Sequence, residues 1–266
     1  MEVRRIAGAL GAEILDVDLS KDFPKEQVRQ AFLEHQVVFF RDQQLDPAQF
    51  MAFARAMGRP IEYPFVKGLP GFPEVIEVKK LEHERHNFGG IWHSDTAYLD
   101  EPPMGSMLIA REIPPFGGDT EFASQYLAYE ALSAEMKKLL SGLKGVNASV
   151  KADATRTRED MVKEYSHSYE AEHPVIRTHP ETGRKALYVN LGHTVRFAGM
   201  SEEESAPLLK FLFQHQVKPE FTCRFQWRVG SLAFWDNRCT QHNPVNDYHG
   251  HRRVMHRITL AGDRPR

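Results

Sequence analysis

Cysteine is scarce in this sequence, with only Cys223 and Cys239 among its 266 residues. The two do not form a CxxC motif and are too few for a disulfide framework. Free cysteine behaves as a small apolar residue, so two buried thiols in a reducing compartment are the simplest interpretation. The first ten residues also lack the apolar run of a secretory signal. We therefore expect a cytoplasmic protein.

Long apolar runs and a dominant charge are absent as well. No stretch approaches the roughly 20 apolar residues that a membrane-spanning helix needs. The formal net charge at pH 7 is -2, from 34 lysines and arginines against 36 aspartates and glutamates. Such a chain has no broad basic field to attract nucleic acid or an anionic membrane, and we expect neither partner. Any anionic ligand must be bound by a local pocket.

Short strands separated by turns are the main pattern after residue 75. The stretches VIEVKK, MLIA, DTEF, KALYVN and SLAFWD are rich in β-branched, aromatic or alternating residues, and glycines or prolines lie between several of them. Earlier in the chain, residues 35–40 (HQVVFF) predict a strand, and apolar residues at helical spacing predict a helix over 47–57. Ser201 and Glu204 form a capping box that predicts a further helix start.

This pattern favours a mainly β fold with flanking helices. Many short strands and few helices indicate an antiparallel double-stranded β-helix (a jelly roll, cupin-like) rather than a parallel α/β fold. We predict a single domain over residues 1–266. The polar, weakly periodic stretch 147–172 is predicted to be a lid or insertion.

Three residues could form a metal site. His93 and Asp95 are two positions apart in the stretch WHSD, so in an extended segment both side chains point the same way. By itself, a His-x-Asp triplet more often reflects a surface hydrogen bond than a metal site. His242, far along the chain, is the candidate third ligand. Two imidazoles and one carboxylate on one face of a metal leave positions open for substrates, as in non-haem Fe(II) oxygenases.

Two arginines lie in the last predicted strand. Arg253 and Arg257 are four residues apart, so they share one side of that strand. Without His242 upstream, a side exposed to water would be the simpler interpretation. The alternative is that both guanidiniums bind anions inside the fold.

Five stretches of the sequence resemble the taurine dioxygenase family of Fe(II)- and 2-oxoglutarate-dependent enzymes, and together they span most of the chain. The resemblance implies an oxidoreductase that uses Fe(II), 2-oxoglutarate and O2, hydroxylates its substrate and releases succinate and CO2. The five stretches are WHSDTAY (92–98), GGDTEF (117–122), HPVIRTHPETGRKALYVN (173–190), WDNRCTQH (235–242) and RRVMHRITLAGDRP (252–265).

The same resemblance implies a role for six residues. His93, Asp95 and His242 would bind the iron. Thr120 and Arg253 would hold the distal carboxylate of 2-oxoglutarate, which agrees with the two-pronged fit of a guanidinium to a carboxylate. Arg257 would face the anionic group of the primary substrate, which is then a small anionic molecule, a sulfonate, sulfate ester or carboxylate. The family resemblance is also compatible with a homo-oligomer.

The substrate pocket departs from the taurine pattern. Tyr63 stands where the taurine enzyme has a histidine for the sulfonate, and Val66 stands where it has a tyrosine for the amine. Tyr63 is therefore our candidate substrate-binding residue beside Arg257. Because a buried amine without partners is costly, these changes argue against taurine itself and for a more apolar tail.

Two alternatives from other classes use the same residues. A zinc hydrolase could bind its metal through the same histidines and aspartate, with no dependence on 2-oxoglutarate and no role for Arg253. A catalytically inactive jelly-roll protein that binds a small anion would take up ligand without forming succinate.

Overall fold

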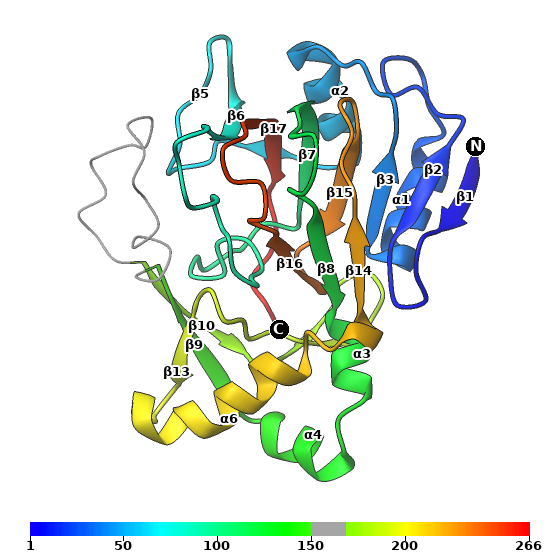
Figure 1. Ribbon diagram of the computed structural model, residues 1–266. Helices are drawn as coiled ribbons and strands as arrows, with labels where there is room; N and C mark the ends of the chain where they lie inside the picture. The colour runs from blue at the N-terminus through cyan, green and yellow to red at the C-terminus, as the bar shows by residue number, and fades with distance from the viewer. Residues whose placement is uncertain (150–168) are drawn as a thin grey trace.

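The computed structural model describes residues 1–149 and 169–266 (Figure 1). The lid predicted over 147–172 therefore lies mostly outside the described residues. The prediction of a single domain over 1–266 stays a prediction. None of the helices in the described ranges combines the length and apolar character that crossing a membrane requires.

The main sheet has its C-terminal strand near its centre. Strand β17 (Arg253–Leu260) pairs antiparallel with β7 (Gly105–Glu112) on one side and β6 (Phe72–Lys80) on the other. The two arginines of β17 are thereby placed inside the molecule. The sheet order is β1-β2-β3-β15-β7-β17-β6-β5, with β1 (Glu2–Arg5), β2 (Ala12–Leu15), β3 (Val37–Phe40), β15 (Leu232–Asp236) and β5 (Gly68–Leu69), and β4 (Pro60–Ile61) pairs with β17.

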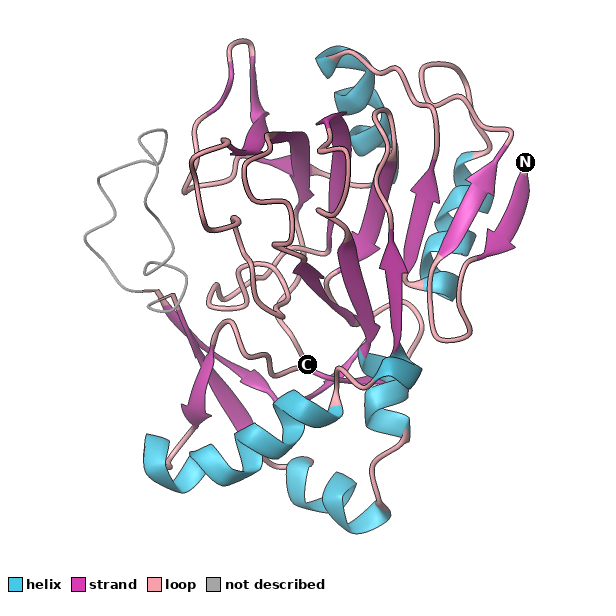
Figure 2. Ribbon diagram, viewed as in Figure 1, coloured by secondary structure: helices cyan, strands magenta, loops and turns pink. Residues whose placement is uncertain are grey.

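A smaller sheet faces the main one. It consists of β14 (Thr222–Phe225), β8 (Thr120–Ser124) and β16 (Thr240–Pro244), in that order (Figure 2). Phe39 of the main sheet stacks on Phe225 of the small sheet, with ring centroids 4.0 Å apart, and meets Phe122 edge-on at 5.7 Å. These side chains belong to one buried apolar cluster shared by both sheets. The main sheet is antiparallel except between β2 and β3, and two such sheets packed over a common core are the arrangement of a jelly roll.

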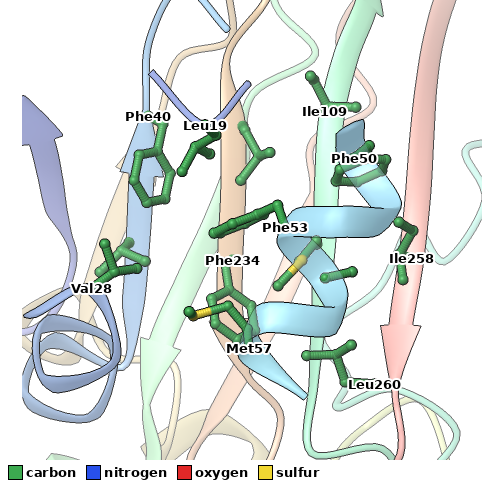
Figure 3. Packing of buried hydrophobic residues seen from close by; sticks show 14 of the residues in the cluster. Leu19, Val28, Phe40, Phe50, Phe53, Met57, Ile109, Phe234, Ile258 and Leu260 are labelled. Carbon is green, nitrogen blue, oxygen red and sulfur yellow. The ribbon is translucent and has the colours of Figure 1, made fainter. Parts of the chain in front are cut away.

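Two helices cover the outer face of the main sheet (Figure 3). Helix α1 spans Lys25–His35 and α2 spans Pro47–Met57, the range predicted from the sequence. In α2, Phe53 packs edge-on against Phe40 at 5.7 Å and Phe234 at 6.3 Å. Each such fully buried side chain stabilises the fold by about 1.5–3 kcal/mol.

The strand predicted from His35 starts two residues later. His35 ends α1, and Gln36 takes the left-handed conformation (φ 66°) that closes the helix. The extended run therefore begins at Val37. The β-branched residues signalled the strand, but the helix end depended on the packing of α1.

The remaining elements of the described ranges form a layer at one end of the sandwich. The capping box predicted at Ser201 and Glu204 is present and starts α6 (Glu202–His215). The other elements are β9 (Lys144–Ala148), β10 (Glu170–Pro174), β11 (Ile176–Thr178), β12 (Lys185–Leu187), β13 (Thr194–Phe197), α3 (Gln125–Glu130), α4 (Ala134–Leu140) and the short 3-10 helix Pro219–Phe221.

Candidate metal centre

The three predicted metal ligands lie together. His93 and His242 face each other in an isolated β-bridge, with backbone hydrogen bonds of 3.1 and 2.9 Å running in both directions. Paired residues of a bridge project to the same side, and the two imidazole centroids are 4.2 Å apart. Asp95 Oδ1 is 3.6 Å from His93 Nε2 and 3.8 Å from His242 Nε2. All three side chains are buried.

The protonation of these groups suits a divalent cation. The Nδ1 atom of His93 lies 2.7 Å from the Ile91 carbonyl oxygen, which can only accept, so a neutral His93 presents its Nε2 lone pair. Burial, followed by the neighbouring His93, lowers the pKa of His242 well below its usual range. Burial alone would raise the pKa of Asp95, but Arg257, His242 and His93 together hold it well below its usual range. Neutral imidazoles and an ionised carboxylate are the ligand forms that a metal requires.

Two glycines make room for the His93 side chain. A Cβ at Gly89 would lie 2.9 Å from Cε1 of His93, and one at Gly192 would lie 2.8 Å from its Cβ. Gly89 also has φ +68°, a conformation that L side chains rarely adopt. The imidazole can therefore occupy its position only because these neighbours have no side chains. The residues present fit a bound divalent metal.

The second oxygen of Asp95 is held on its far side. Oδ2 accepts a 2.7 Å hydrogen bond from Ser106 Oγ and lies 2.8 Å from Nη2 of Arg257. Asn237 in turn donates to Ser106 Oγ at 3.3 Å. These contacts turn Oδ1 toward the two histidines. The sequence did not identify Ser106, and it indicated Asn237 only as a member of the WDNRCTQH stretch.

Both arginines of β17 point into the same pocket as the histidines. The pocket is lined by His93, His242, Thr120, Arg253 and Arg257, among others. Arg253 is 6% exposed and Arg257 is 4% exposed, which excludes the solvent-exposed alternative. Burial lowers the pKa of Arg253, and its Nε and Nη2 have no hydrogen-bond partner in the part of the chain that the structure describes. A buried guanidinium with unpaired donors calls for an anion.

Aromatic rings stand beside Arg257. Its guanidinium carbon is 5.2 Å from the centroid of the Tyr63 ring. Tyr63 contacts Phe65 and Phe88 edge-on, with centroids 5.3 and 6.3 Å apart. The structure thus brings Tyr63 next to Arg257, as the sequence predicted, and adds Phe88 as a pocket residue that it had missed.

A second buried cluster has similar residue types but different contacts. Asp236 Oδ2 lies 3.0 Å from His179 Nε2, with Cys239 nearby. Arg238 donates to both oxygens of Asp236, at 2.8 and 2.7 Å. Burial raises the pKa of the Cys239 thiol well above its usual range, so this sulfur stays protonated. A neutral thiol and a carboxylate whose two oxygens are both bound by one permanent cation are poor metal ligands.

Comparison with known families and structures agrees with this site. Residues 2–259 match the family model described as "Taurine catabolism dioxygenase TauD, TfdA family". The chain belongs to the TauD/TfdA dioxygenase family. The predicted enzyme class is confirmed.

Several proteins similar to this chain match it over almost its whole length. An alkylsulfatase of Acinetobacter baylyi is 37% identical, over 99% of this chain and 86% of that protein. An alpha-ketoglutarate-dependent (2-oxoglutarate-dependent) sulfate ester dioxygenase of Pseudomonas putida is 36% identical, over 100% of this chain and 91% of that protein. A taurine dioxygenase structure from Burkholderia xenovorans aligns with a TM-score of 0.82 at 37% identity, over 99% and 92% of the two chains. The predicted jelly-roll fold is confirmed.

Proposed function

We propose that this enzyme oxidises a small anion with an apolar tail, and that its preferred substrate is a sulfate ester. The reaction class follows from the family: it is a 2-oxoglutarate-dependent dioxygenase that uses Fe(II), 2-oxoglutarate and O2. The observation that carries the proposal is one pocket holding a His-Asp-His cluster and two buried arginines with unpaired donor atoms. A zinc hydrolase would have no role for Arg253, whose unpaired donors call for an anion in the pocket.

His93, Asp95 and His242 are the proposed iron ligands. Bound Fe(II) supplies the oxidation of the substrate by dioxygen, coupled to the conversion of 2-oxoglutarate into succinate and CO2. Ser106 and Arg257 fix the orientation of Asp95 through its second oxygen. Such supporting contacts typically change metal affinity 10- to 100-fold.

Thr120 and Arg253 are the proposed site for the distal carboxylate of 2-oxoglutarate. The two residues lie in the pocket on facing sheets, β8 and β17. The unpaired Nε and Nη2 of Arg253 can bind a carboxylate in the two-pronged manner of guanidinium pairs. Fixing one end of the cosubstrate limits the positions its reacting end can take, which favours the productive geometry.

Arg257 and Tyr63 are proposed to select the primary substrate. The Nε atom of Arg257 has no hydrogen-bond partner in the described part of the chain, so an anionic head group can use it. The adjacent rings of Tyr63, Phe65 and Phe88 form an apolar wall that suits an alkyl or aryl tail. The alkylsulfatase and sulfate ester dioxygenase relatives support the same substrate class. Val66 stands where the taurine enzyme has a tyrosine for the amine, so the ammonium of taurine would lose that partner and taurine should be a poor substrate.

The first test is an anaerobic titration of the protein with Fe(II) and 2-oxoglutarate, followed by its weak visible charge-transfer band. We expect the band in the wild type, its loss in His93→Ala, and a weaker affinity for 2-oxoglutarate in Arg253→Ala. Turnover is then measured as succinate formed with a medium-chain alkyl sulfate, an aryl sulfate and taurine. Binding of sulfate esters without succinate formation would instead identify an inactive anion-binding protein.

A matched pair of variants tests the substrate assignment. Arg257→Ala removes the proposed anion partner, and Arg253→Ala removes the proposed cosubstrate partner on the same strand. Because Arg257 also contacts Asp95, turnover is measured at saturating Fe(II); the first variant should then mainly raise the KM for the sulfate ester, and the second the KM for 2-oxoglutarate. Equal effects on both constants would contradict the separate roles. The predictions of a cytoplasmic location, a homo-oligomer and no nucleic-acid or membrane partner stay predictions.

A further inference from the structure

Trp227 makes a hydrogen bond that bears on the cosubstrate site. It follows strand β14, is 6% exposed and donates from Nε1 to Thr120 Oγ1 at 3.0 Å. Phe225 packs against it at right angles, with centroids 4.9 Å apart and planes at 87°, so the indole is held in place. We infer that Trp227 is a positioning residue, which orients the Thr120 hydroxyl toward the carboxylate of 2-oxoglutarate. This inference rests on the proposed function.

The direction of the hydrogen bond decides where the threonine proton goes. An indole N–H can only donate, so Thr120 Oγ1 must accept. The hydroxyl keeps its own proton for a second partner. In the described part of the chain, the Thr120 side chain makes no other hydrogen bond, and it lines the pocket together with Arg253. A carboxylate accepts only, and it therefore completes this arrangement.

The indole ring also borders the other half of the carboxylate site. The guanidinium carbon of Arg253 is 5.7 Å from the Trp227 ring centroid, within the range of a cation–π contact. Trp227 thus touches Thr120 through its N–H and faces Arg253 with its ring. Trp227→Phe removes the N–H and one of the two fused rings and keeps a smaller ring beside Arg253, so its dependence on Thr120 is measured to separate the two contacts.

The rival explanation is purely structural. A buried tryptophan usually finds an acceptor for its N–H, and Thr120 could serve only that purpose. In that case the loss of the N–H would weaken the fold but not the binding of 2-oxoglutarate. The two explanations differ in whether the effect of Trp227 on binding depends on the Thr120 hydroxyl.

The experiment is a double-mutant cycle on 2-oxoglutarate affinity. Trp227→Phe, Thr120→Val and the double variant are loaded with Mn(II), and 2-oxoglutarate binding is measured by calorimetry under nitrogen. Thr120→Val should weaken binding roughly ten- to a hundredfold, the range for a hydrogen bond to a charged group, and Trp227→Phe roughly three- to tenfold, the range for a neutral one. The double variant should bind as weakly as Thr120→Val alone. In turnover, the KM for 2-oxoglutarate should rise with kcat nearly unchanged.

Trp235→Phe is the matched control. Trp235 lines the same pocket, but its Nε1 donates to Asn237 Oδ1 at 3.0 Å instead of to Thr120. Any effect of this change should be the same with and without Thr120→Val. Thermal unfolding of each variant establishes that it is folded.

Several results would overturn the inference. Additive losses in the cycle, or unchanged affinity in folded Trp227→Phe, would assign Trp227 a structural role. Thr120→Val with wild-type affinity would overturn it even if Trp227→Phe does not fold. Failure of the proposed function looks different, because the wild type would then not bind 2-oxoglutarate, or Arg253→Ala would bind it normally.

Discussion

The two buried His-Asp clusters have nearly the same composition and opposite states of pairing. Both oxygens of Asp236 accept from Arg238, at 2.8 and 2.7 Å, and Oδ2 also contacts His179 at 3.0 Å. Asp95 has such partners at Oδ2 alone, and its Oδ1 faces two histidine nitrogens at 3.6 and 3.8 Å, which is too long for a hydrogen bond. Residue type therefore does not distinguish the structural cluster from the proposed metal site. The pairing of the carboxylate does, because of the two only Asp95 has an oxygen without a hydrogen-bond partner in the described chain.

The fully paired cluster connects distant parts of the fold. Arg238 also binds Glu181 at 2.6 Å, and Glu181 binds Arg29 of helix α1 at 2.5 Å. The corner between β15 and β16 is thereby tied to a loop and to a helix on the outer face. This corner leads directly to His242, so the structural cluster supports the position of a proposed iron ligand.

Removing the incompletely paired carboxylate should have the largest effect on activity. Asp95→Ala deletes a proposed iron ligand, and we expect Fe(II) affinity and turnover to fall more than about 100-fold, beyond the range for supporting contacts. Anaerobic Fe(II) titration and succinate formation are the measurements. A variant that keeps near wild-type Fe(II) affinity would show that the metal binds elsewhere.

Removing the fully paired carboxylate should instead affect stability. Asp236→Asn removes one carboxylate partner of buried Arg238 and leaves another, Glu181. Breaking a buried pair typically costs about 3–5 kcal/mol of unfolding free energy, and we expect a loss near the lower end because Glu181 remains. Urea unfolding of the metal-free protein measures this loss. The folded fraction should keep its Fe(II) affinity within about threefold. If Asp236→Asn loses metal binding while keeping its stability, the contrast between the clusters is wrong.

A smaller change tests how Asp95 is oriented. Ser106→Ala removes the 2.7 Å hydrogen bond to Oδ2 and leaves Arg257 in place. We expect Fe(II) affinity to fall roughly tenfold, because the carboxylate can then turn away from the histidines. Ser106→Thr, which keeps the hydroxyl, is the control. Equal Fe(II) affinity in Ser106→Ala and the wild type would mean that Arg257 alone orients Asp95.

The sequence predicted those elements and site residues that have a signal in the local sequence or in a family motif. His93 and Asp95 are two apart in one extended segment, and α2 matches its predicted range because its caps and apolar spacing are local. Strand β1 gave no such signal, since all four of its residues are exposed and carry no pattern of burial. The roles of His242 and Arg253 came from the stretches that resemble the family, because residue spacing alone left those roles open.

The supporting contacts depend on register, which the sequence does not state. Ser106 lies opposite Thr259 and Trp235 in the main sheet, and this pairing brings it to Asp95. Trp227 reaches Thr120 only because β14 pairs with β8. A shift of either pairing by one residue would turn these side chains to the other face. Such residues could be found only once the sheets were known.

The smallest expected effect is the pH dependence of the structural cluster. Burial alone would raise the pKa of Asp236, but Arg238 and His179 hold it far below its usual range. A carboxyl with a depressed folded-state pKa stabilises the fold above its unfolded pKa, about 3.9, and loses that stabilisation as the pH falls.

The difference in unfolding free energy between wild type and Asp236→Asn should thus be constant above about pH 5. It should shrink by about 0.4 kcal/mol at pH 3.9 and by about 1.3 kcal/mol at pH 3. Urea unfolding across this range measures the difference, and variants at exposed carboxylates such as Glu2 provide the background. If the free-energy difference instead widens as the pH falls, Asp236 is protonated in the folded protein. The cluster would then be held by neutral hydrogen bonds instead of by the charge of Arg238.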